Sequence, residues 1–223
     1  MLSMSEHGGL AAAILAGGRA RRLGEIDKSA LTIDGETIME RLLGVLASVT
    51  PHIFAVGDRY GAATAAGLRV VPDAIPDSGP LGGVYTAIVS SPCDRTLVVG
   101  CDMPFLTGPF LRYLAERSET LSVMPRTANG YEPLCAIYAR ETAAALRERL
   151  DRGERQAAHP PGGVQVIEVG AEELAAFDPD GLLFVNVNSP HDYARAQRML
   201  ARATTTLKNE PDDDAITLSL IHI

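Results

Sequence analysis

Four loops combine glycine, proline, amide or charged residues in spacings that could serve phosphate chemistry. The first, residues 15–28, begins Leu-Ala-Gly-Gly and contains four basic and two acidic residues, although the whole chain has a net charge of −8. Paired glycines let the backbone approach a ligand, free amide hydrogens can cradle phosphate oxygens, and Arg and Lys neutralise a polyphosphate. We therefore predict a phosphate-binding loop; the alternative is a flexible surface loop with solvated arginines.

The spacing of this first loop excludes two common nucleotide-binding motifs. A Walker A loop would need glycine where Asp27 precedes Lys28, and the GxGxxG dinucleotide fingerprint is absent. We expect neither a P-loop NTPase nor a Rossmann dehydrogenase.

The second loop places a carboxylate at the end of an apolar segment. Asp102 follows the apolar residues 96–100 and lies two residues before Pro104. One hard oxygen of Asp102 could bind Mg²⁺ while triphosphate oxygens and water complete the octahedron. On spacing alone, a helix cap or an Asx turn explains Asp102 equally well.

The other two loops are less specific. Residues 72–83 place Asp73 and Asp77 among glycines and prolines before a helix, which suits an anion site, a rigid binding wall or an ordinary loop. Residues 185–190 read Val-Asn-Val-Asn-Ser-Pro, and Ser-Pro is typical of a helix cap and first turn. Capping and ligand contact can both hold there.

Strands that alternate with helices must position these loops. The apolar run 10–16 predicts a strand buried on both faces. We expect further strands at 52–56, 68–71, 96–100, 121–124, 134–139, 164–169 and 183–186, and helices at 38–49, 84–90, 109–117, 141–149 and 191–204. The alternation predicts one α/β, Rossmann-like three-layer domain with a mostly parallel sheet, made mixed by an antiparallel connection between 121 and 139. The last helix should pack back on the sheet.

Composition excludes several classes of protein. With 46% hydrophobic and 22% charged residues the chain is typical of a globular enzyme. No segment approaches the roughly 18 apolar residues of a membrane span, and residues 1–9 lack the features of a signal peptide. The negative charge argues against nucleic acid or anionic lipid as partners. We expect a cytoplasmic protein with a flexible N-terminus at 1–9, a domain at 10–204 and a disordered or non-native tail at 205–223.

Histidine and cysteine residues show no pattern of a metal site. The five histidines lie far apart, and Cys93, Cys101 and Cys135 form no CxxC pair. We expect core thiols in a reducing compartment.

In their order along the chain, several elements closely resemble the MobA-type molybdenum cofactor guanylyltransferases. They are the LAGG start, Arg22-Leu23-Gly24 with Asp27-Lys28, GPLGG at 79–83, CDMP at 101–104 and VNVNSP at 185–190. The similarity runs from about Ala11 to Ala201, and Gly153-Glu154-Arg155 looks like a further family feature.

That resemblance implies a nucleotidyltransferase that joins the GMP moiety of GTP to molybdopterin with Mg²⁺ and releases pyrophosphate. It implies nucleotide contacts at Leu15, Ala16, Gly17, Gly18, Lys28, Asp73 and Asp102, with Mg²⁺ on Asp102. Arg22, Lys28 and Asp102 would be catalytic, and Asn186 and Asn188 would lie on the pterin side. Partner proteins would supply molybdopterin and receive the cofactor.

Rival assignments and one departure accompany the resemblance. Related cytidylyl enzymes typically carry LAAG, so Gly17-Gly18 favours GTP over CTP. A cytidylyl- or sugar-nucleotide transferase, or a non-catalytic nucleotide- or cofactor-binding partner, would also keep the first loop. Residues 55–59, Ala-Val-Gly-Asp-Arg, stand where the family often has an Asn-rich element that contacts the nucleotide.

Overall fold

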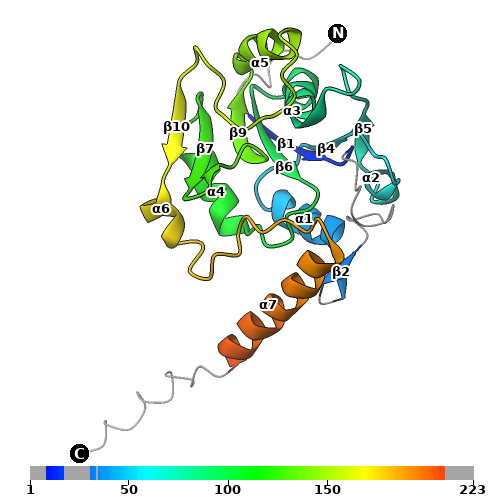
Figure 1. The fold of residues 1–223 in the computed structure, drawn as a ribbon, viewed down its shortest axis with the longest axis vertical. Helices are drawn as coiled ribbons and strands as arrows, with labels where there is room; N and C mark the ends of the chain where they lie inside the picture. Colours follow the sequence, from blue (N-terminus) through cyan, green and yellow to red (C-terminus); the bar gives the residue numbers. More distant parts are fainter. Residues whose placement is uncertain (1–8, 18–30, 34, 209–223) are drawn as a thin grey trace, which may run out of the picture.

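A mixed sheet with helices on both faces forms the body of the molecule (Figure 1). The computed structural model describes residues 9–17, 31–33 and 35–208, with the backbone alone for 200–208. In sheet order the strands are β10 (Val166–Val169), β7 (Ser122–Thr127), β9 (Cys135–Ala139), β6 (Arg95–Gly100), β1 (Leu10–Leu15), β4 (Ile53–Val56) and β5 (Arg69–Val71), with β8 (Gly130–Tyr131) beside β7. The pairs of β1 with β4 and β6 are parallel, whereas β9 is antiparallel to β6 and β7. This confirms the predicted mixed α/β fold.

Strand β1 is central because its side chains supply both cores. Successive residues of a strand point to opposite faces, so Ala12 and Ile14 pack with one cluster and Ala11 and Ala13 with the other. All four are fully buried, which explains the continuous apolar run.

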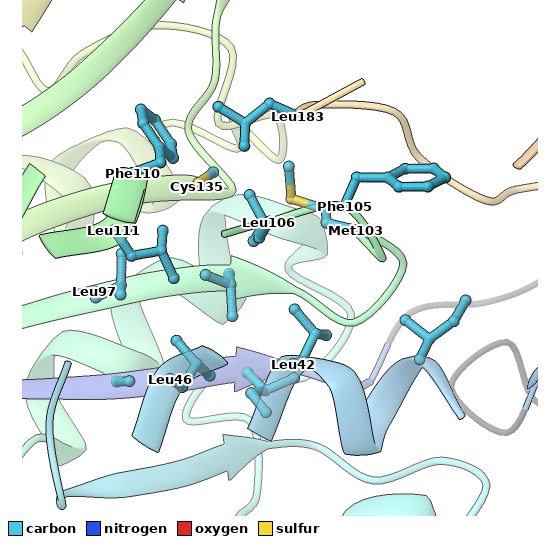
Figure 2. Packing of buried hydrophobic residues seen from close by; sticks show 14 of the residues in the cluster. Leu42, Leu46, Leu97, Met103, Phe105, Leu106, Phe110, Leu111, Cys135 and Leu183 are labelled. Atoms are coloured by element: carbon cyan, nitrogen blue, oxygen red, sulfur yellow. The ribbon is translucent and has the colours of Figure 1, made fainter. Parts of the chain in front are cut away.

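Helices divide between the two faces according to these clusters. One face carries α1 (Ile38–Ala47), α4 (Gly108–Glu116) and α6 (Ala171–Ala175), and the other carries α3 (Gly79–Ser90) and α5 (Thr142–Asp151). Figure 2 shows the first core, where Leu42 and Leu46 of α1 lie across from Leu106 and Leu111. The short helix α2 (Ala62–Ala65) and the hairpin of β2 (Thr32–Ile33) and β3 (Glu36–Thr37) complete the elements before α3.

Three expectations about the elements are wrong. Residues 183–186 form no strand: Leu183 and Val187 are buried, but as parts of a loop that joins no ladder. Helix α3 begins at Gly79, five residues earlier than expected, because Pro80 is tolerated in a first turn where its missing N–H has no partner to lose. Helix α7 (Pro190–Lys208) packs on the first core only near its start, where Ala196 is buried, and its remainder projects from the body (Figure 1). It contacts β2, where the hydroxyl of Tyr193 donates to the carbonyl of Thr32.

The predicted ends of the domain are only partly within the described residues. Helix α7 continues to Lys208, and residues 1–8 and 209–223 lie outside the described part of the chain. Within that part, no helix is both long and apolar enough to cross a membrane.

Candidate functional site

A cleft of about 960 Å³ lies at the carboxyl edge of the parallel strands. Ligands of open α/β sheets bind at this edge because the loops after successive parallel strands meet there. The lining residues come from the last residues of β1, β4 and β6, from the loops after β1, β4, β5 and β6, from α3 and from two later segments. They are Leu15, Gly17, Val56, Arg59, Asp73, Asp77, Ser78, Gly79, Pro80, Gly83, Gly100, Cys101, Asp102, Leu134 and Asn188.

Most of the predicted site residues that the structure describes meet at this cleft. Leu15, Gly17, Asp73, Asp102 and Asn188 line it. The buried Ala16 lies between the first two and donates its N–H to the carbonyl of Val56 at 2.9 Å. Asn186 is exposed and is not among the lining residues. Gly18, Arg22 and Lys28 lie outside the described residues.

The loops after β1 and β4 touch through two glycines. A Cβ built on Gly57 would lie only 2.7 Å from the Cα of Gly17, and Gly57 has a φ of +65°. Its N–H donates to the carbonyl of Val71 at 2.8 Å, which fixes the turn to β5. The sequence-based interpretation missed Gly57, although a glycine directly after a buried strand was an available signal. Only glycine fits this contact, because both its φ and its space exclude a side chain.

Residues 55–59, which depart from the family pattern, contribute one charged side chain to the fold and one to the cleft. The carboxylate of Asp58 accepts the backbone N–H groups of Ala63 and Thr64 at 3.1 and 2.8 Å, so it caps the short helix α2. Arg59 lines the cleft and stacks over the ring of Tyr60, with 5.9 Å from its Cζ to the ring centroid. Among the described lining residues, Arg59 is the one cation.

Two carboxylates face the cleft from the loop between β5 and α3. Burial, and then the neighbouring charge of Asp77, raise the pKa of Asp73 above its usual value. A Cβ on Gly17 would lie 3.6 Å from Oδ2 of Asp73, so this carboxylate is next to the first loop. The N–H of Ala74 donates to Oγ1 of Thr86 in α3 at 3.0 Å, which fixes the loop to the helix. An acceptor at this point suits a base or a sugar better than a phosphate, since like charges repel.

The first turn of α3 forms one wall of the cleft. Glycine is required at Gly82 because a Cβ there would lie 1.6 Å from Oγ and 2.4 Å from Cβ of Ser78. A Cβ on Gly83 would lie 3.1 Å from Cδ1 of Leu15, which is a tight contact. The hydroxyl of Ser78, which is buried, donates to the carbonyl of Ile75. Gly83 thus lets α3 approach the end of β1, and Gly82 leaves room for the side chain of Ser78.

Asp102 lies in the loop directly after β6. A Cβ on Gly100 would be 2.8 Å from its Oδ1, so the carboxylate lies close over the end of the strand. Its backbone carbonyl accepts the N–H of Val187 at 2.9 Å, which brings residues 185–190 to the same loop. In the described part of the chain no group of three His, Cys, Asp or Glu side chains could hold a metal.

Residues 188–192 confirm the capping interpretation at the start of α7. The N–H of Asn188 and the hydroxyl of Ser189 donate to Oδ2 of Asp192 at 3.2 and 2.8 Å, and the N–H of Asp192 donates to Oγ of Ser189 at 3.1 Å. These hydrogen bonds use the backbone of Asn188. The side of the cleft that includes Asn188 is thus also the start of α7, so its capping role leaves the residue at the cleft.

The cysteines behave largely as expected. Cys93 and Cys135 are buried, Cys101 is half-buried beside Asp102, and none of the three forms a disulfide. Burial raises the pKa of the Cys135 thiol far above its usual value, which keeps it protonated.

Comparisons with known proteins match most of the chain. The family model described as a MobA-like NTP transferase domain matches residues 12–166. A probable molybdenum cofactor guanylyltransferase of Pelotomaculum thermopropionicum is 36% identical and covers 86% of this chain and 94% of its own length. A molybdenum cofactor guanylyltransferase of Syntrophotalea carbinolica is 28% identical, with 84% and 90% covered. The crystal structure of molybdopterin-guanine dinucleotide biosynthesis protein A from Archaeoglobus fulgidus superposes with a TM-score of 0.72 at 25% identity, covering 86% of this chain and 99% of that one.

Proposed function

The chain belongs to the MobA-like NTP transferase family, and we propose that it transfers GMP from GTP to molybdopterin with release of pyrophosphate. The product is the molybdopterin guanine dinucleotide cofactor. The observation that carries this proposal is the meeting of Gly17, Asp73 and Asp102 around one cleft, in a chain that aligns with guanylyltransferases over most of its length.

The nucleotide would lie between the first loop and Asp73. Leu15, Ala16 and Gly17 present backbone at the end of β1, and the next residues, Gly18 to Lys28, carry the basic charge that suits the phosphates. An ionised carboxylate only accepts hydrogen bonds. Guanine offers it two adjacent donors, the N1–H and the 2-amino group, whereas cytosine offers a single amino group. Asp73 therefore favours GTP.

Asp102 suits the metal that the reaction requires. It would hold Mg²⁺ through a hard carboxylate oxygen at the cleft, a ligand that suits this ion. Bound Mg²⁺ would supply charge neutralisation across the triphosphate.

The chemical step is an in-line substitution between two anions. An oxygen of the phosphate monoester of molybdopterin forms a bond to the α-phosphorus of GTP, and the bond to the leaving pyrophosphate breaks. The residues of the chain bring the two anions together and hold them in line, so catalysis comes from positioning and electrostatics without a covalent enzyme intermediate. We assign Arg22 and Lys28 to offset charge on the transferred and leaving groups.

The acceptor would approach from the side of residues 185–190. The hydrogen bond from Val187 to the carbonyl of Asp102 holds this segment against the proposed metal loop. Asn188 lines the cleft there, and Asn186 lies two residues before it on the surface. The two substrates would therefore meet next to Asp102, with the pterin on the Asn188 side.

The broader setting of the reaction stays a prediction from the sequence. It comprises a cytoplasmic location, a catalytic unit at residues 10–204, and partner proteins that supply molybdopterin and receive the finished cofactor.

A nucleotide panel with the wild-type chain and Asp73→Asn tests the assignment of GTP. Ligands that bind only the folded state stabilise it, by about 2.7 kcal/mol at a concentration about 100 times Kd. We expect GTP with Mg²⁺ to raise the melting temperature of the wild-type protein and CTP to have little effect. Asp73→Asn should weaken GTP binding by about tenfold, because the NH₂ group of the amide is a donor and cannot accept the hydrogen bonds of the guanine N1–H and 2-amino groups. Stabilisation by CTP alone would instead indicate a cytidylyltransferase.

The same variant should not destabilise the ligand-free protein. Because the folded pKa of Asp73 is raised, the folded state binds more protons than the unfolded state between the usual value of 3.8 and the raised value. The stability that Asp73 contributes therefore falls as pH rises through that window, and above it Asp73→Asn should melt at or above the wild-type temperature. Asp180→Asn, at an exposed position outside the cleft, is the control and should change neither property. Unchanged GTP affinity in Asp73→Asn would exclude this carboxylate as a nucleotide contact.

A further inference from the structure

A short segment that follows α5 lies across the first turn of α3. The carbonyl of Arg155 accepts the N–H of Leu81 at 3.1 Å, and a Cβ on Gly79 would lie 2.8 Å from the same oxygen. Ala157, two residues later, is buried in the core cluster that contains Leu81 and Val84. Residues 153–159 therefore pack on the part of α3 that forms a wall of the cleft, where Gly79 and its neighbours are lining residues.

One nearly buried cation holds this segment in place. The side chain of Arg149 in α5 is only 10% exposed, and its Nε donates to Oε2 of Glu154 at 2.7 Å. Its Nη1 and Nη2 donate to the carbonyls of His159 and Gln156 at 3.1 and 3.0 Å. All three nitrogens of the guanidinium are thus bound to residues 154–159, in the planar multidentate geometry that lysine cannot reproduce.

The contacts of α3 continue from this segment to the proposed nucleotide contacts. Gly83, one turn after Gly79, packs against Leu15, and Thr86 holds the loop of Asp73 through the N–H of Ala74. A shift in the first turn of α3 would therefore move the walls that face the nucleotide. On the proposed pterin side, Val187 is attached to the backbone of Asp102.

We propose that Arg149 is a positioning residue for the nucleotide, acting through residues 153–159 and the first turn of α3. The proposal rests on the proposed function, because it assigns the cleft beside α3 to GTP. It predicts that loss of the guanidinium weakens GTP binding more than it slows the chemical step. If Arg149 served stability alone, its loss would lower the melting temperature and leave GTP binding unchanged.

The test compares Arg149→Met, Arg149→Lys and Glu154→Gln with the wild-type protein, below the melting temperature of each. The readouts are the Kd of GTP with Mg²⁺ by calorimetry, and KM and kcat in the transferase assay. We expect Arg149→Met to raise the Kd and KM for GTP by about tenfold, while kcat at saturating GTP stays within about threefold of wild type. Glu154→Gln should raise the Kd and KM for GTP by about threefold. Arg149→Lys should raise them by an amount between those of Glu154→Gln and Arg149→Met, because each of these two variants keeps part of the hydrogen-bond set.

The control variant is Arg117→Met. It removes an Arg–Glu pair of the same chemistry, 3.2 Å between Arg117 and Glu173, on the opposite face of the sheet. Arg117→Met should leave the Kd for GTP unchanged whatever it does to the melting temperature.

Two outcomes would overturn the role of Arg149. One is an Arg149→Met protein whose melting temperature falls while its Kd for GTP stays within about twofold of wild type. If Arg149→Met does not fold, Glu154→Gln decides, since Glu154 is 40% exposed and its amide should be tolerated; unchanged GTP binding in that variant also overturns it. Failure of the wild-type protein to bind GTP would instead contradict the proposed function. The ratios between variants would then be measured with the nucleotide that stabilises the wild type.

Discussion

Asp102→Ala should lower kcat for pyrophosphate release by about a hundredfold or more, while the protein still folds. Removal of one positioned electrostatic contact typically costs roughly 3 kcal/mol in the barrier. The carboxylate of Asp102 lies over the end of β6 and faces the cleft where both substrates would meet. The hydrogen bond that holds residues 185–190 uses its backbone carbonyl, which alanine retains. The fold should therefore survive the loss of catalysis.

The measurement is pyrophosphate release at saturating GTP, molybdopterin and Mg²⁺, with the melting temperature recorded for each variant. Asp102→Asn keeps the size of the side chain and should show a similar loss, which separates charge from packing. Asp94→Asn is the matched control, since Asp94 precedes the opposite end of the same strand and pairs with Arg140 on the surface. A wild-type rate in Asp102→Ala would remove Asp102 from the mechanism.

Gly57→Ala should raise KM for GTP by about a hundredfold. The new Cβ would lie 2.7 Å from the Cα of Gly17, a backbone atom that no rotamer change can move away. The first loop must shift to relieve the contact, and a displacement of about 1 Å at a reactive site can cost about a hundredfold. The Kd of GTP should rise in parallel.

A substitution at a second glycine distinguishes the effect of this contact from the effect of backbone strain. Gly61 has a φ of +82°, but a Cβ there would meet nothing within 4 Å. Gly61→Ala therefore carries the cost of a left-handed alanine, about 1 kcal/mol of stability, without the contact, and should bind GTP normally. Equal GTP binding by Gly57→Ala and Gly61→Ala would show that the touching loops are not needed for the nucleotide.

The parts of this site that could be predicted from sequence follow from simple periodicity. Apolar runs alternating with helical patterns indicated a mostly parallel sheet, and the carboxyl ends of parallel strands meet at one edge. Gly17, Asp73 and Asp102, which are far apart in the chain, therefore had to converge. Residue type indicated a phosphate role for the first loop and allowed a metal role for Asp102, whereas the base role of Asp73 came from the family resemblance.

Other features depend on packing that periodicity does not encode. The contact of Gly57 with Gly17 exists because β1 and β4 are neighbours, which a local pattern cannot reveal. The Gly-Pro-Leu-Gly-Gly sequence has the composition of a loop, yet it forms the first turn of α3 and packs on Ser78, Leu15 and Arg155. Arg149 looks like one more charged residue on a polar helix, and only the folded segment after α5 buries it.

The most direct test is pyrophosphate release by the wild-type protein with Mg²⁺ and molybdopterin, in parallel with GTP and with CTP. We expect release that requires both GTP and molybdopterin, a product with the mass of the guanine dinucleotide cofactor, and a kcat/KM at least about tenfold lower with CTP. No release with GTP and molybdopterin, or a rate with CTP that equals or exceeds that with GTP, would contradict the proposed function.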